Sequence, residues 1–127
     1  MLEKNLYEYA VIRIMPRVER EEFLNVGVVL YCAGKKFLEA KYMLQHERVT
    51  SFCNTCDLSE IETYLKAFQQ IAHGEDNAGP ISKLPLAARF RWLTATRSTV
   101  VQTSKVHPGM CVEPKDVLQK LFYELVG

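Results

Sequence analysis

The sequence has no long uninterrupted run of apolar residues. The longest one, residues 26–33, is far shorter than the roughly 20 residues that a helix needs to cross a bilayer. The N-terminus carries acidic residues early and has no apolar segment of signal-peptide length. We therefore expect a cytoplasmic protein that neither spans a membrane nor is secreted by an ordinary signal. In that compartment the four cysteines are expected to be free thiols.

An excess of charge of either sign is also missing. Sixteen Lys and Arg residues face fifteen Asp and Glu residues, which gives a net charge of +1. This balance argues against bulk nucleic acid or an anionic membrane as a general electrostatic partner. The 127 residues are 48% hydrophobic and contain no internal repeat or long linker, so we predict a single domain over residues 1–127 with one hydrophobic core.

Motifs of familiar catalytic chemistry are absent as well. The six glycines are scattered and form no phosphate-cradling loop, and there is no Gly-x-Ser-x-Gly sequence. The three histidines lie far apart in the sequence, and no nucleophile stands near a base. A binding function is therefore favoured over an enzymatic one, and no cofactor is expected.

What is present in the first half of the chain is a strong strand pattern. Residues 7–14 are rich in aromatic and β-branched side chains on both faces, which predicts a strand that is central or covered on both sides. Pro16 lacks an N–H and is expected to end its pairing. Residues 26–32 and 36–44 predict a hairpin that turns around Gly34.

Apolar residues at helical spacing predict three helices. They cover residues 46–53, residues 59–72 and a C-terminal segment that starts near Pro114. Residues 73–85 predict a loop, because they are rich in glycine, proline and polar residues. The order of elements indicates an α+β fold with a single antiparallel sheet and helices packed on one face.

The segment after residue 86 has a weaker pattern. Arg89 and Arg91 alternate with two aromatic residues, which predicts a strand. A second strand over residues 98–102 would pair with it through a turn at residues 94–97. His107 is followed by proline and glycine, which predicts another turn.

Residues 77–112 contain no Asp or Glu but five basic residues. These are Lys83, Arg89, Arg91, Arg97 and Lys105. One interpretation is a site for phosphate, carboxylate or nucleic acid, because arginine binds such groups through its planar fork and a strand would aim Arg89 and Arg91 from one face. The favoured interpretation is a solvated face whose acidic partners lie elsewhere in the sequence.

Arg13 lies within the apolar first strand, where a charged side chain needs a partner. The candidate partners are Glu8, Glu19 and Glu22, and a structural ion pair is the favoured interpretation. Asn25 and Gly27 are expected to form the turn into the second strand, because both residue types tolerate unusual backbone angles.

Cys53 and Cys56 have the spacing of a metal knuckle or a redox pair. A structural zinc site needs two further ligands, and the sequence has no second pair with suitable spacing. A redox pair usually starts a helix that follows a strand, whereas this pair falls between two predicted helices. We therefore expect neither a bound metal nor a redox function.

Two stretches resemble the opening and second blocks of a bacterial family of unknown function, numbered 3037. They are residues 7–31, which include YEYAVIR, PRVEREEF and NVGVVLY, and residues 89–102, RFRWLTATRSTVVQ. The resemblance implies a small bacterial cytosolic protein. Genes of this family tend to lie beside those of HipA-like kinases, so the resemblance also implies a non-catalytic accessory module with such a kinase as its protein partner.

The cysteine pair does not belong to the family pattern. We expect any binding surface to centre on the two blocks, with Arg13, Arg17, Asn25, Arg91 and Arg97 as its residues.

Overall fold

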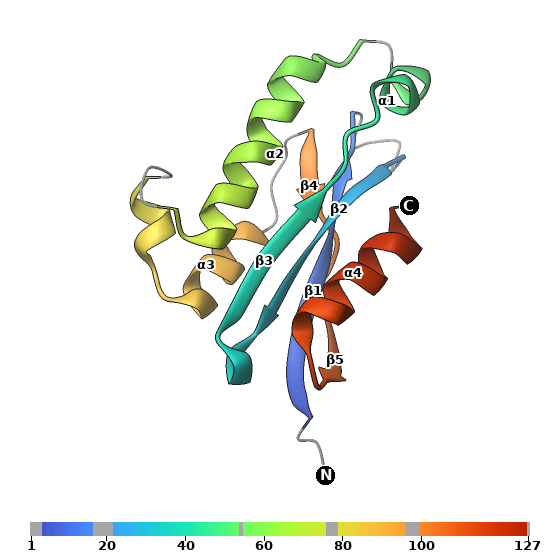
Figure 1. Cartoon of the computed structure of the whole chain (residues 1–127). Helices are drawn as coiled ribbons and strands as arrows, with labels where there is room; N and C mark the ends of the chain where they lie inside the picture. Colours follow the sequence, from blue (N-terminus) through green and yellow to red (C-terminus); the bar gives the residue numbers. More distant parts are fainter. Residues whose placement is uncertain (1–3, 17–21, 54, 76–78, 96–99, 127) are drawn as a thin grey trace.

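The computed structural model describes residues 4–16, 22–53, 55–75, 79–95 and 100–126. The strands are β1 (Asn5–Ile14), β2 (Leu24–Cys32), β3 (Phe37–Tyr42), β4 (Val101–Thr103) and β5 (His107–Cys111). The helices are α1 (His46–Phe52), α2 (Leu58–His73), α3 (Leu86–Leu93) and α4 (Pro114–Leu125), with 3-10 turns at η2 (Ala33–Lys35) and η4 (Pro80–Lys83). The strands form one antiparallel sheet (Figure 1), which confirms the predicted α+β class.

β1 lies at the centre of this sheet. The strand order is β3-β2-β1-β4, and β5 also pairs with β1. β2 pairs with residues 8–14 of β1, whereas β5 and β4 pair with residues 5–9 and 12–14 on its other edge. The prediction of a central strand from its two apolar faces is therefore confirmed. None of the helices in the described ranges has the length and apolar character needed to cross a membrane.

β4 and β5 follow one another along the same edge of β1 and are separated by a bulge. Ile12 pairs with Thr103, and Tyr9 pairs with His107. β1 therefore advances three residues while the edge strand advances four. Between them, the Ser104 N–H donates to the backbone carbonyl of Val11 at 2.8 Å. This arrangement is the one-residue excess that defines a β-bulge.

The predicted turn at His107 is wrong, because His107, Pro108 and Gly109 lie inside β5. Proline is tolerated here because β5 is an edge strand, where a missing N–H need not break a ladder. Glycine is required because the Tyr7 ring lies across the strand, where it would overlap an added Cβ at Gly109. A proline followed by a glycine is therefore compatible with an edge strand as well as with a turn.

Helices cover both faces of the sheet, so the prediction of helices on one face needs correction. One core cluster joins β1, β2 and β3 to α1, α2 and α3, and includes Ile12, Val29 and Leu65. A second cluster on the other face joins Val28 and the following alternate residues of β2 to α4. The physical reason is that the central strands are apolar on both faces, and each face must be shielded from water. Figure 1 shows α2 and α4 on opposite sides of the strands.

The predicted strand at residues 89–92 is a helix, α3. Leu86, Phe90 and Leu93 recur at helical spacing and turn toward the first core, where Phe90 and Leu93 are buried. This period overrides the apparent alternation of arginine and aromatic residues. Because residues 89–92 are helical, the predicted hairpin does not form. β4 pairs with β1 instead, and residues 96–99 of the predicted second strand and turn lie outside the described ranges.

Candidate functional site

The structure brings two of the predicted site residues together. Arg13 and Asn25 are opposite each other on β1 and β2, beside an irregularity in the register. The Arg13 guanidinium carbon lies 3.9 Å from the centroid of the Phe23 ring, a cation–π arrangement. Burial lowers the pKa of Arg13, and its Nε is buried without a hydrogen-bond partner among the described residues. Of the predicted carboxylate partners, Glu8 falls on the opposite face by strand alternation, and Glu19 lies outside the described ranges.

Asn25 has a structural role that the sequence did not indicate. It lies in β2 rather than in the predicted turn, and its Nδ2 donates to the Leu125 carbonyl at 3.2 Å. Arg48 of α1 donates from Nη1 to the Val126 carbonyl at 3.0 Å. These two donors bind carbonyls at the C-terminal end of α4, which have no partner within the helix. The Arg48 contact links residues 78 positions apart, so no local pattern could have revealed it.

Gly27 also belongs to β2 rather than to a turn. A Cβ at this position would come within 2.6 Å of the Lys41 carbonyl oxygen and 2.9 Å of the Tyr42 Cβ. Glycine is therefore needed because β3 approaches β2 closely here. Its role is steric and not a matter of unusual backbone angles.

Arg91 lies elsewhere on the molecule. It is exposed on α3, whose Phe90 ring stacks on Tyr31 with a centroid distance of 5.4 Å. Tyr31 pairs with Glu8, five positions along β1 from Arg13, a separation of about 17 Å in a strand. Arg17 and Arg97 lie outside the described ranges. The structure therefore groups Arg13 with Asn25 and does not place Arg91 beside them.

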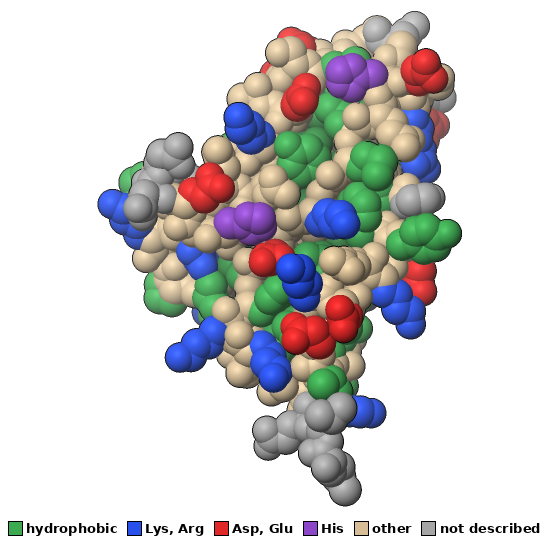
Figure 2. Space-filling model, viewed as in Figure 1, with side chains coloured by type: hydrophobic (Ala, Val, Ile, Leu, Met, Phe, Trp, Pro, Cys, Tyr) green, Lys and Arg blue, Asp and Glu red, His purple; other side chains and the backbone are tan. Residues whose placement is uncertain are grey.

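Arg89 and Arg91 do not share the face that the anion-site interpretation of the basic segment requires. Arg89 and Arg91 are two positions apart on a helix, which turns their side chains roughly 200° from each other around its axis. Arg89 donates from Nη1 to the Ser82 carbonyl at 2.8 Å, next to the end of α2. Arg89 therefore links α3 to η4. Figure 2 shows acidic and basic side chains interspersed on the face that carries α2, β3 and α4.

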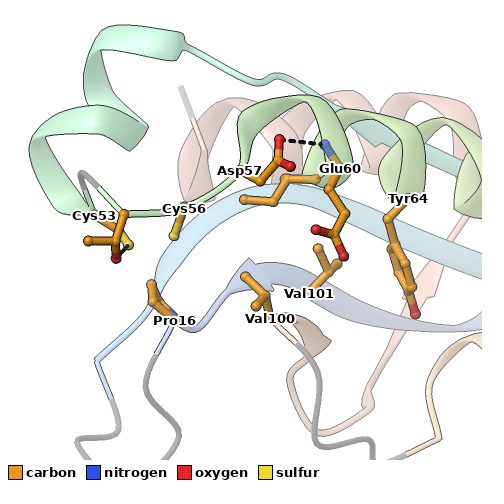
Figure 3. A pocket seen from close by; sticks show the side chains of 10 residues that line it. Pro16, Cys53, Cys56, Asp57, Glu60, Tyr64, Val100 and Val101 are labelled. Carbon is orange, nitrogen blue, oxygen red and sulfur yellow. Dashed lines mark hydrogen bonds between the residues drawn. The ribbon is translucent and has the colours of Figure 1, made fainter.

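A pocket of about 400 Å³ opens where α2 begins, at the same end of the sheet as Arg13. Its described walls come from the segment joining α1 to α2, the first turns of α2, and the adjoining ends of β1 and β4 (Figure 3). The lining residues are Pro16, Cys53, Thr55, Cys56, Asp57, Glu60, Ile61, Tyr64, Val100 and Val101. The volume is within the range of small-molecule sites.

Caps of the two flanking helices position the cysteines in this pocket. Cys53 ends α1, and its N–H donates to the Val49 carbonyl at 2.7 Å. Cys56 immediately precedes Asp57, the N-cap of α2, whose carboxylate accepts from the Glu60 N–H at 3.2 Å (Figure 3). Both thiols are half-buried and free. They lie at a helix start, although no strand leads into it.

The two thiols differ in their electrostatic surroundings. A hydrogen bond from Cys56, followed by one from Thr55, lowers the pKa of Cys53. The sulfur of Cys53 lies 3.4 Å from the Thr55 hydroxyl oxygen. Burial, followed by the hydrogen bond to Cys53, raises the pKa of Cys56 to about 11. These surroundings favour the thiolate at Cys53 and the protonated thiol at Cys56.

The described residues contain no group of three or more histidine, cysteine or acidic side chains placed to hold a metal ion. A family model with the description "Protein of unknown function (DUF3037)" matches residues 9–126, nearly the whole chain. No curated protein and no solved structure matches.

Proposed function

Since the chain belongs to the DUF3037 family, we propose that it is a non-catalytic binding module whose protein partner is a HipA-like kinase. The kinase follows from the family resemblance. The observation that carries the binding role is an exposed apolar pair, Leu6 of β1 and Met110 of the edge strand β5. Leu6 is 55% exposed and Met110 is 58% exposed. The two residues are directly opposite each other on β1 and β5.

The edge itself supports this proposal. Within the described residues, β5 pairs with β1 and with no other strand. An edge strand presents outward N–H and C=O groups to which a partner segment can add as a further strand. Pro108 lacks an N–H, so a partner strand would meet one missing donor near the middle of β5. The apolar pair would then supply contacts to alternate side chains of the partner.

The burial of Leu6 and Met110 on binding determines how much the pair is expected to contribute to the free energy of association. Complete burial of a leucine or methionine side chain is worth about 1.5–3 kcal/mol. A little more than half of each side chain is exposed here, so the pair would contribute about 2–3 kcal/mol to association. This corresponds to a change in Kd of about 30-fold or more.

The test is isothermal titration of the full chain with a purified HipA-like kinase from the same genome. The double variant Leu6→Glu and Met110→Glu is expected to weaken binding by at least about 30-fold. Tyr123→Glu is the matched control, because Tyr123 is 78% exposed on α4, which covers the other face of the sheet. No binding by the wild-type chain would reject the kinase as partner. Equal binding by the wild-type and double-variant chains would reject the β5 edge as the surface.

Arg91 provides an independent test of the predicted surface. It is exposed and makes no ion pair with a described residue, so Arg91→Glu is expected to leave Tm nearly unchanged. The same substitution would repel an acidic partner surface and weaken association. Arg97→Glu is expected to act in the same direction. Loss of the folded state in either variant would instead identify a structural arginine.

A second candidate is binding of phosphate or nucleic acid by the segment 83–105. The favouring observation is that Lys83, Arg91 and Lys105 are exposed and make no ion pair with a described residue. Fluorescence anisotropy with labelled single-stranded DNA at low and high salt measures this activity. Binding that weakens with salt and with Lys105→Gln would favour this candidate. The absence of binding at low salt would exclude single-stranded DNA as the ligand.

A further inference from the structure

The four cysteines of the chain fall into two pairs with different surroundings. Cys32 and Cys111 are buried in the second core beneath α4. Cys53 and Cys56 instead line the pocket at the start of α2. Figure 3 shows them on one segment, across the opening from Pro16 and Val100. A ligand in the pocket would therefore meet this pair and not the buried one.

The two pocket thiols have different surroundings, which indicate different roles. The sulfur of Cys53 lies 3.4 Å from the Thr55 hydroxyl oxygen, and the Cys56 thiol lines the same pocket. Both groups can donate to a thiolate, and such bonds stabilise its negative charge. Cys56 lies three positions further along the same segment and lines the same pocket, so its thiol is the candidate to attack a disulfide formed at Cys53. Reactive cysteines occur in partly exposed surroundings that favour the thiolate.

We propose that Cys53 and Cys56 form a thiol–disulfide exchange centre for a low-molecular-weight disulfide, with Cys53 as the attacking thiol and Cys56 as the resolving thiol. The proposal does not depend on the kinase partner. It revises the expectation from sequence that the pair has no redox function.

The exchange takes place in two steps, each of which forms one disulfide bond and breaks another. The Cys53 thiolate attacks one sulfur of the small disulfide, so that a mixed disulfide forms and one small thiolate leaves. Cys56 then loses its proton to solvent and attacks the Cys53 sulfur, which releases the second small thiolate. Two protein thiols are oxidised to one disulfide, and the small disulfide is reduced to two thiols once its thiolates are protonated.

The pocket indicates a small reactant. Its volume of about 400 Å³ admits a small molecule, and its described walls include apolar side chains from Ile61 and Val101. The charged residues among the described lining are Asp57 and Glu60, and Figure 3 shows the Glu60 carboxylate extending toward the cavity. Cystamine, a small disulfide with two ammonium groups, is therefore the probe of choice.

The first experiment measures alkylation of the reduced full chain by iodoacetamide at pH 7, with peptide mapping over time. The pKa of Cys56 is about 11, whereas that of Cys53 is below the ordinary thiol value of 9.0. Cys53 therefore carries the larger thiolate population at this pH. Although a more acidic thiol is a weaker nucleophile, we expect Cys53 to react at least about tenfold faster. Equal rates, or faster reaction of Cys56, would overturn the assignment of roles.

The second experiment adds cystamine to the reduced chain and maps its disulfides. The wild-type chain is expected to form a Cys53–Cys56 disulfide, and Cys56→Ser is expected to retain a stable mixed disulfide on Cys53. Cys53→Ser should react far more slowly than Cys56→Ser, and circular dichroism checks that each variant is folded. Cys32 and Cys111 are the internal control and should remain unmodified. A wild-type chain that forms no internal disulfide, or one that reacts first at Cys32 or Cys111, would refute the proposal.

Discussion

Replacing Phe122 by alanine tests whether α4 covers the second face of the sheet. Phe122 is 6% exposed and packs in the cluster formed by α4 and alternate residues of β2. The Lys41 ammonium lies 4.8 Å from the centroid of its ring. Removal of the ring leaves a cavity in this cluster, which also contains the completely buried Val28. The variant therefore loses both the transfer free energy of the ring and the contacts around it.

The expected loss in the free energy of unfolding is about 3–5 kcal/mol, the usual cost of a buried Phe→Ala substitution. This is a large fraction of the roughly 5–15 kcal/mol that stabilises a typical domain. Urea denaturation followed by circular dichroism is the assay. With an m-value of about 2 kcal/mol/M, the midpoint should fall by about 1.5–2.5 M.

The next residue in the sequence supplies the control. Tyr123 is also aromatic and lies on the same helix, but it is 78% exposed. Tyr123→Ala should change the free energy of unfolding by less than about 0.5 kcal/mol. If Phe122→Ala costs less than about 1 kcal/mol, or if the two substitutions cost the same, α4 does not pack on β2 as described.

Three further outcomes are expected. Arg48→Met should lower the free energy of unfolding by about 1–2 kcal/mol, because it removes a charged donor from the C-terminal end of α4; Arg48→Lys should recover part of this loss, and equal stability of all three proteins would contradict the contact. Gly74→Ala should cost about 1–2 kcal/mol in thermal unfolding, because Gly74 has φ of 71° and an added Cβ would displace Arg89; an unchanged Tm would show that the backbone relaxes. Elemental analysis of freshly purified protein should find no stoichiometric zinc, and zinc that disappears when Cys53 and Cys56 are replaced by serine would prove this prediction wrong.

The sequence correctly predicts those elements in which apolar residues recur with a single period. The strand of residues 7–14 and the α2 helix were predicted because alternation or helical spacing continues over many residues. The α3 segment was misassigned because its arginines and aromatics alternate over four residues, while the helical spacing of Leu86, Phe90 and Leu93 spans eight. The amphipathic stripe of α4 shows that the helix packs on something, but it does not say which face of a sheet with two apolar faces it covers.

The candidate site was less predictable, because its geometry depends on contacts between distant segments. The spacing of Cys53 and Cys56 was visible, but the pocket beside them requires Val100 and the end of β1 to meet α2. Asn25 was selected as a site residue, but its amide binds α4 one hundred positions away. Such pairings are set by the packing of whole elements, which one sequence does not reveal.

The pairing of β1 with β5 also determines when the fold can be completed during synthesis. Asn5 pairs with Cys111, so one edge of the central strand has no partner until most of the chain has left the ribosome. The hairpin of β1 and β2 can form early, but it would expose an apolar face that α4 later covers. Contacts of such long sequence separation slow folding and leave open strand edges that aggregate. β5 and α4 therefore complete one edge and the second face of the sheet, and the chain is most prone to aggregate before they are in place.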